Sequence, residues 1–256
     1  MGLIPVSVVT GFLGSGKTTL ISRVLRDPGF ARTAVIVNEF GEIGLDHDLV
    51  VGGDETLLSL STGCLCCAVR SDLVTTLLDL ERRQEAGEIA VERVLIETSG
   101  LADPAPILHA LMTDPALGAR FRLGSVVVLV DAVFGAATLA THVEARRQVG
   151  FADIAVVTKT DLAPVAPGLA AAIALAHPGL KPQTEVPDMA DLFAPGTGPA
   201  GEAVARHTTG VGACLIRRTR PVPALALTLL LEALAEQCGP RMLRFKGLFD
   251  VAEAPG

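Results

Sequence analysis

The segment GFLGSGKT at residues 11–18 constrains the fold of this 256-residue chain more than any other. An apolar run at residues 4–10 precedes it, and a helical pattern begins at Thr18. The spacing fits G-x-x-x-x-G-K-[S/T], in which glycines let successive backbone N–H groups point inward toward a phosphate. The start of the following helix adds its positive end. The order strand, loop, helix therefore predicts a phosphate-binding loop rather than a glycine-rich turn that only joins two elements.

Two side chains of this loop carry the expected chemistry. The Lys17 ammonium neutralises charge on the β- and γ-phosphates, and the Thr18 hydroxyl takes a place on Mg²⁺. The other loop residues expected to contact a nucleotide are Gly11, Gly14, Ser15, Gly16 and Thr19.

Apolar runs and helical patterns alternate along most of the chain. The expected strands are residues 4–10, 33–38, 93–97, 124–131 and 153–158, and the expected helices are 18–26, 70–85, 107–113 and 137–147. Runs such as VVVLV at 126–130 do not alternate with polar residues, which indicates burial on both faces of a sheet. The expected fold is α/β, a three-layer P-loop NTPase domain with a mostly parallel sheet.

The chain divides into three parts by composition. Residues 1–193 form the expected P-loop domain, and the Gly-, Ala- and Pro-rich residues 194–212 form a linker. Residues 213–256 contain a strand-like run (213–219), a helical run (225–237) and a second strand-like run (242–251). This short β-α-β segment is too small to bury much surface alone. We therefore expect it to pack on the first domain or to begin a longer one.

Charge and hydropathy exclude two classes of partner. The net charge of −7 argues against a broad basic surface for nucleic acid. The longest stretch without acidic or basic residues, 162–180, contains Pro164, Pro167 and Pro178, which interrupt the hydrogen bonds of a membrane-spanning helix. No basic region precedes a signal-type apolar core. A cytoplasmic protein that binds neither nucleic acid nor membrane is expected.

The segment TKTD at residues 158–161 follows a predicted strand, where a loop meets the base of a bound nucleotide. Asp161 can accept hydrogen bonds from N1–H and the 2-amino group of guanine, whereas adenine lacks both donors. Thr158 and Lys159 complete this loop, although the usual GTPase pattern has Asn in place of Thr158. The alternative is an exposed aspartate that caps a helix.

Another predicted strand ends in ETSG at residues 97–100. An acidic residue such as Glu97 can hold Mg²⁺ or its water, and the Gly100 N–H can contact the γ-phosphate.

Three of the five cysteines, Cys64, Cys66 and Cys67, lie within four residues of one another. For a cytoplasmic chain a disulfide framework is not expected. Cys-x-Cys-Cys supplies at most three thiolates to Zn²⁺ or another thiophilic ion, one fewer than a closed tetrahedral site. An open, exchangeable site suits metal transfer. Buried apolar cysteines and a redox-active cluster are the alternatives.

The order GFLGSGKTT, NEFGEIGLD, GCLCC, ETSGLADP, VDAV and TKTD resembles the CobW-type family of P-loop GTPases, relatives of the hydrogenase and urease nickel-insertion GTPases. The resemblance covers residues 4–193. RFKGL at 244–248 resembles the opening of the family's C-terminal domain, so residues 213–256 are expected to be the beginning of that domain and incomplete.

The resemblance implies a metallochaperone that depends on GTP and Mg²⁺. It implies Zn²⁺ or Co²⁺ at Cys64, Cys66 and Cys67, with Glu42 as a further ligand and Glu39 at the nucleotide. Slow GTP hydrolysis would be coupled to metal delivery to a client metalloprotein, and a homodimer is compatible with this scheme. Two rival hypotheses are a small-molecule kinase with structural cysteines and a zinc-storage or redox module.

Overall fold

The computed structural model describes residues 2–38, 57–59, 66–193, 218, 220–238 and 249–253, with the backbone alone for 38, 57–59 and 66–71. The strands are β1 (Ile4–Gly11), β2 (Thr33–Asn38), β3 (Leu57–Ser59), β4 (Arg93–Thr98), β5 (Phe121–Asp131), β6 (Ile154–Thr158) and β7 (Pro182–Gln183). The helices are α1 (Lys17–Leu25), the 3-10 turn η1 (Pro28–Phe30), α2 (Cys66–Glu85), α3 (Ala105–Thr113), α4 (Pro115–Gly118), α5 (Gly135–Thr141), α6 (Val143–Phe151), α7 (Leu169–Ala176), α8 (Met189–Leu192) and α9 (Ala224–Cys238).

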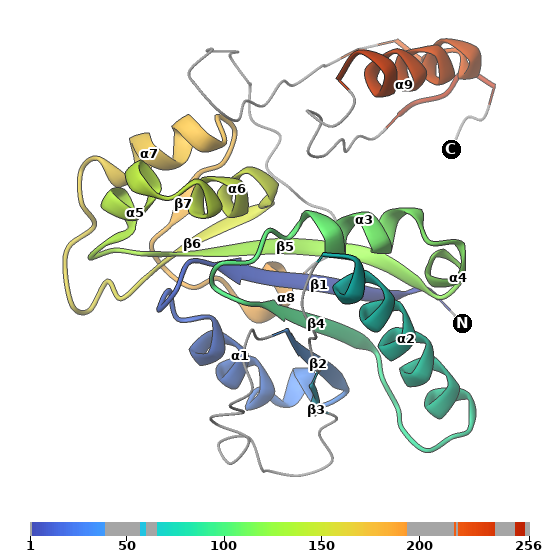
Figure 1. Ribbon diagram of the computed structural model, residues 1–256, viewed down its shortest axis with the longest axis horizontal. Coiled ribbons are helices and arrows are strands. Elements are labelled where there is room, and N and C mark those ends of the chain that lie inside the picture. The colour runs from blue at the N-terminus through green and yellow to red at the C-terminus, as the bar shows by residue number, and fades with distance from the viewer. Residues whose placement is uncertain are drawn as a thin grey trace.

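The strands form one sheet in the order β3-β2-β4-β1-β5-β6-β7. Every strand pairing within the described residues is parallel. β1 is the central strand, and Figure 1 shows it crossing the molecule between β4 and β5. The sheet confirms the expected α/β fold and the parallel arrangement.

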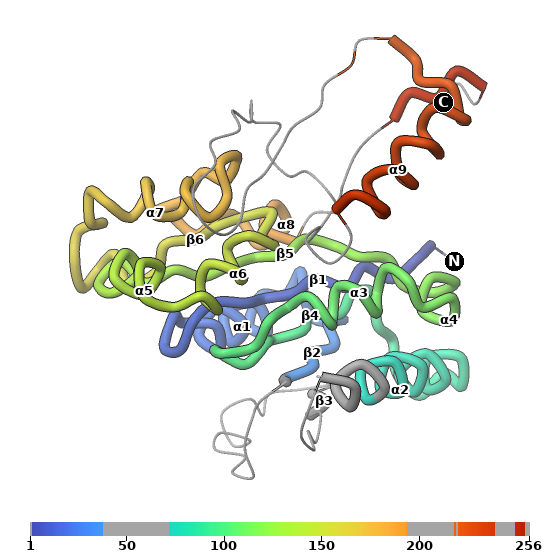
Figure 2. The backbone as a smooth tube through the Cα atoms, turned by 45° about the horizontal axis from the view of Figure 1, so that its top comes forward, coloured from blue at the N-terminus to red at the C-terminus, as the bar shows by residue number. Residues whose placement is uncertain are grey.

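Helices cover both faces of the sheet, as burial on both faces requires. On one face, α1, η1 and α8 pack against residues such as Val9, Val35 and Leu129. On the other, α2, α3 and α4 cover the β2–β4–β1 side and α5, α6 and α7 cover the β5–β6 side. Figure 2 shows this division, with α5, α6 and α7 grouped around β6 and α2 at the opposite end. These layers confirm the three-layer architecture.

Two helices differ from their expected bounds. The helix expected at 137–147 is divided into α5 and α6 at His142, whose backbone is extended (φ −105°, ψ 123°). The His142 ring packs on Phe12 with ring centroids 4.5 Å apart, and the Arg146 guanidinium donates to the last carbonyls of α5. These contacts compensate the broken helical hydrogen bonds. The helix expected at 70–85 begins four residues earlier, at Cys66.

The helical run expected at 225–237 is present as α9. A parallel bridge joins Val222, before the helix, to Val251, after it, and Val222 lies beyond the expected strand-like run at 213–219. The proposed linker and most of both strand-like runs lie outside the described residues. No helix in the part of the chain that the structure describes is long and apolar enough to cross a membrane.

The packing of α2 on the sheet makes a testable prediction. Leu77 is fully buried in the core on that face. Replacing it with Ala should lower the free energy of unfolding by about 3 kcal/mol, because a cavity remains where the side chain was. The Arg82 side chain in the same helix is 69% exposed, so Arg82→Ala should lower the free energy of unfolding by less than about 0.5 kcal/mol. Urea unfolding of both variants measures the difference, and equal losses would contradict this packing.

Candidate functional site

The carboxyl ends of β1, β4, β5 and β6 meet at one edge of the sheet. The parallel register pairs Val9 with Glu97 and Asp131 with Thr158. Crevices at this edge are where open α/β sheets bind ligands. The register therefore brings together three segments that are separate in the sequence: the phosphate loop, the segment after β4 and the segment after β6.

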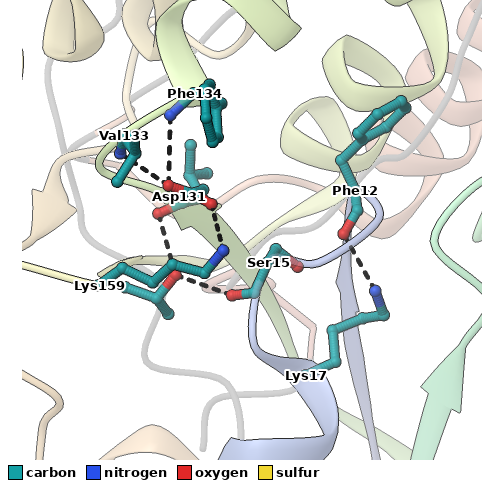
Figure 3. A network of polar contacts seen from close by, with 9 residues as sticks. Phe12, Ser15, Lys17, Asp131, Val133, Phe134 and Lys159 are labelled. Carbon is teal, nitrogen blue, oxygen red and sulfur yellow. Dashed lines mark hydrogen bonds and ion pairs between the residues drawn. The ribbon is translucent and has the colours of Figure 1, made fainter. Parts of the chain in front are cut away.

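The phosphate loop joins β1 to α1, and α1 begins at Lys17. Gly16 precedes the helix with φ +93°, a left-handed conformation that glycine adopts without strain. The Lys17 ammonium donates to the carbonyls of Gly11 (2.9 Å) and Phe12 (3.1 Å), and the contact with Phe12 is visible in Figure 3. Lys17 is buried, so its charge is held within the loop.

The neighbouring helix residue, Thr18, contacts the end of β4. Its hydroxyl donates to the Glu97 carboxylate at 2.9 Å, and Glu97 is buried. Beneath this pair, the buried hydroxyls of Thr98 and Thr10 are hydrogen bonded at 2.8 Å and join β4 to β1. Hydroxyl and carboxylate oxygens are the ligands that Mg²⁺ prefers. The donor set at Thr18 and Glu97 therefore fits this ion.

Gly100 lies against the phosphate loop. A Cβ atom at this position would be 2.8 Å from the backbone nitrogen and Cα of Leu13, so a side chain is excluded. The segment that begins at Glu97 thus contacts the loop both at Leu13 and, through Glu97, at Thr18. Glu97 and Gly100, which make these contacts, are the two residues of ETSG that the sequence analysis selected.

The segment after β6 contacts the loop from the opposite side. The Thr158 hydroxyl donates to the carbonyl of Ser15 at 2.7 Å. Although Thr158 replaces the usual asparagine, it keeps a donor that reaches the loop. Asp161 is exposed. Gly14 and Thr19 are also exposed, the former within the loop and the latter in the first turn of α1.

Lys159 contacts a residue that the sequence analysis did not select, Asp131 at the end of β5. The ammonium lies 2.5 Å from the Asp131 carboxylate, which also accepts from the backbone N–H groups of Val133 (2.7 Å) and Phe134 (3.2 Å), as Figure 3 shows. Burial raises the pKa of Asp131, but the hydrogen bonds from Lys159 and the two backbone groups outweigh this and lower the pKa overall. Lys159 has φ +58°, and no other non-glycine residue among those described has a positive φ.

The positive φ of Lys159 costs of order 1 kcal/mol, which the surrounding contacts must offset. In the sequence, Asp131 follows the VVVLV run and lies within the VDAV motif, but neither feature assigns it a partner.

A pocket of about 260 Å³ lies beside the phosphate loop. Loop residues 12–15, the end of β5, helices α5 and α6, and Lys159 line it. Most of the lining is apolar, with aliphatic and phenylalanine side chains, and its polar members include Asp131 and Gln148. Gln148 is a second residue that the sequence analysis missed.

Several expected metal and nucleotide contacts are not described. Cys64, Glu39 and Glu42 lie outside the described residues, and the backbone alone is described for Cys66 and Cys67, which begin α2.

Comparison with known proteins agrees with this geometry. The model of the "CobW/HypB/UreG, nucleotide-binding domain" family matches residues 5–186. The zinc chaperone YjiA of Escherichia coli is 31% identical over an alignment that covers 100% of this chain and 84% of YjiA. The zinc chaperone CobW of a Sinorhizobium species is 37% identical over 53% of this chain and 39% of CobW. The crystal structure of the Zn(II)-bound YjiA GTPase from E. coli superposes with a TM-score of 0.64 at 28% identity, covering 93% of this chain and 79% of that chain.

The family model covers the phosphate loop and the segments after β4 and β6 in one match. The chain therefore belongs to the CobW/HypB/UreG family of P-loop GTPases.

Proposed function

We propose that this chain is a GTP-dependent metallochaperone that couples GTP hydrolysis to the transfer of Zn²⁺, or a similar divalent ion such as Co²⁺, to a client protein. The observation that carries the proposal is the convergence of two segments on the phosphate loop through three contacts: Glu97 pairs with Thr18, Gly100 packs on Leu13, and Thr158 bonds to Ser15. The names of the relatives YjiA and CobW, both zinc chaperones, support the metal assignment.

In the proposed mechanism the loop binds the phosphates of GTP. Lys17 exchanges its bonds to the Gly11 and Phe12 carbonyls for phosphate oxygens, and the loop N–H groups surround the β-phosphate. Thr18 and Glu97 would hold Mg²⁺, which would neutralise charge that develops on the phosphates. Asp161 accepts from guanine. Phosphoryl transfer needs mainly positioning and charge stabilisation, so slow intrinsic turnover is expected.

The metal ligands in this proposal are Cys64, Cys66, Cys67 and Glu42. Cys66 and Cys67 begin the helix that follows β3, and α2 packs on the same sheet that carries the phosphate loop. In a parallel sheet, the helix after a strand begins at the edge where the strand ends. This topology supports a metal site at the same edge of the sheet as the phosphate loop, which begins at Gly11. By linkage, GTP and metal must tighten each other's binding by the same factor.

We further propose that residues 1–193 form the GTPase domain, 194–212 a linker and 213–256 the beginning of a second domain. The proposal also includes a client protein that receives the metal and a homodimer of this chain.

The phosphate assignment is tested at Lys17. Lys17→Ala should weaken binding of a fluorescent GTP analogue by at least about 100-fold, because the buried cation that neutralises the phosphates is lost. Lys181→Ala removes an exposed lysine and should bind as the wild type does. An unchanged titration curve for Lys17→Ala would show that phosphate binds elsewhere.

Base selection is tested at Asp161. Asp161→Ala should lower the affinity for GDP by about tenfold or more, while binding of ADP stays at its weak wild-type level, since only guanine donates two hydrogen bonds to the carboxylate. Asp191→Ala, at another exposed aspartate, serves as the control. Competition titrations with both nucleotides measure the ratio of GDP affinity to ADP affinity. A wild-type protein that prefers adenine would favour the kinase hypothesis instead.

The coupling is tested by zinc titration with and without a non-hydrolysable GTP analogue. Wild-type protein should bind zinc more tightly with the analogue present, and the Cys64/Cys66/Cys67→Ser variant should lose this difference. The matched control replaces the two isolated cysteines, Cys214 and Cys238, and should keep it. Equal zinc affinity in both nucleotide states of the wild type would reject coupling.

A further inference from the structure

Helix α6 contacts two of the segments that form the site. At its start, the His142 ring packs on Phe12 of the phosphate loop. Near its end, the side chains of Arg147 and Gln148 bond to the segment between β4 and α3. Because α6 is one rigid helix of nine residues, it fixes these two segments relative to each other.

Gln148 makes the buried part of this contact. Its side-chain amide donates to the carbonyl of Gly100 and to the carbonyl of Ala102, each at 3.1 Å. Gln148 is fully buried, and its neighbours Ala145 and Val149 belong to the apolar core beneath. Its amide oxygen has no hydrogen-bond partner within the described part of the chain. Burying an amide among apolar residues costs free energy, which its hydrogen bonds must offset. The two bonds that Gln148 donates are therefore what a glutamine provides here and an apolar residue would not.

The bonds from Gln148 act on the residue that touches the phosphate loop. Gly100 approaches Leu13 so closely that a Cβ atom would be 2.8 Å from the Leu13 backbone. Three residues further on, Asp103 pairs with Arg147 at 2.9 Å, but the Arg147 side chain is half exposed, so this ion pair contributes little. Of the two α6 side chains that bond to this segment, Gln148 therefore makes the buried contact with Gly100.

We propose that Gln148 is a positioning residue that, by bonding to the carbonyl of Gly100, fixes this residue so that its N–H faces the γ-phosphate and the protein distinguishes GTP from GDP. The inference rests on the proposed function, in which the Gly100 N–H contacts the γ-phosphate. GDP lacks this phosphate, so the contribution of Gln148 is specific to the GTP state. A residue with only a structural role would change the affinity for both nucleotides together.

The test replaces Gln148 with Met, which has a similar volume, suits the apolar surroundings and donates no hydrogen bond. Gln148→Met should reduce the ratio of GTP-analogue to GDP affinity, and the rate of GTP hydrolysis, by about tenfold each, as expected for two lost hydrogen bonds. The affinity for GDP itself should stay within about twofold. Gln148→Glu, whose carboxylate only accepts, should show at least the same loss.

The control is Gln84→Met, because the Gln84 side chain also bonds to a backbone group, the Val91 N–H, but does so at the far end of α2. Gln84→Met should keep the wild-type nucleotide ratio. A Gln148→Met protein with the wild-type ratio would overturn the inference alone, whereas wild-type protein that neither binds GDP nor hydrolyses GTP would overturn the proposed function.

A measurement on wild-type protein covers the case in which neither Gln148 variant folds. Amide hydrogen exchange at residues 100–102 should be slower with the GTP analogue than with GDP, because the γ-phosphate completes the contacts of a peptide that Gln148 already holds. Equal exchange in both states would contradict the inference.

Discussion

The parallel pairing of β1 with β4 on one side and β5 on the other is the constraint on which the site depends. Parallel strands end at the same edge of a sheet, so the central position of β1 surrounds its carboxyl end with the ends of neighbouring strands. The phosphate loop leaves β1 at Gly11 and contacts the end of β4 on one side and, beyond β5, the end of β6 on the other. A loop after an edge strand would have a neighbour on one side only.

Contacts from both sides hold the loop in shape. From the β4 side come the Thr18–Glu97 hydrogen bond and the close approach of Gly100, and from the β6 side comes the bond of Thr158 to the carbonyl of Ser15. Each hydrogen bond contributes about 1 kcal/mol, but together they restrain a loop whose glycines would otherwise allow many conformations. A binding site that is held in place before its ligand arrives loses less entropy on binding.

Those parts of the fold that depend on local pattern could be predicted from the sequence. Continuous apolar runs identified β1, β2, β4, β5 and β6, because a strand buried on both faces needs no polar alternation. Contacts between distant segments could not be predicted in this way. The division between α5 and α6 at His142 depends on a ring contact with Phe12, and the interior amide of Gln148 on carbonyls about 46 to 48 residues away in the chain. Asp131 was passed over because its partner, Lys159, follows a different strand.

The same topology bears on how a metal site could sense the nucleotide. β2 ends at Asn38, which is paired in register with Thr98, the residue after Glu97. β2 therefore ends beside the strand whose carboxylate, Glu97, contacts Thr18. β3, the next strand outward, precedes α2, which begins at Cys66. Three strand spacings separate β3 from β1, about 15 Å in all. Over so short a distance, one segment that contacts both ligands is sufficient to couple them, and no change in the sheet itself is required.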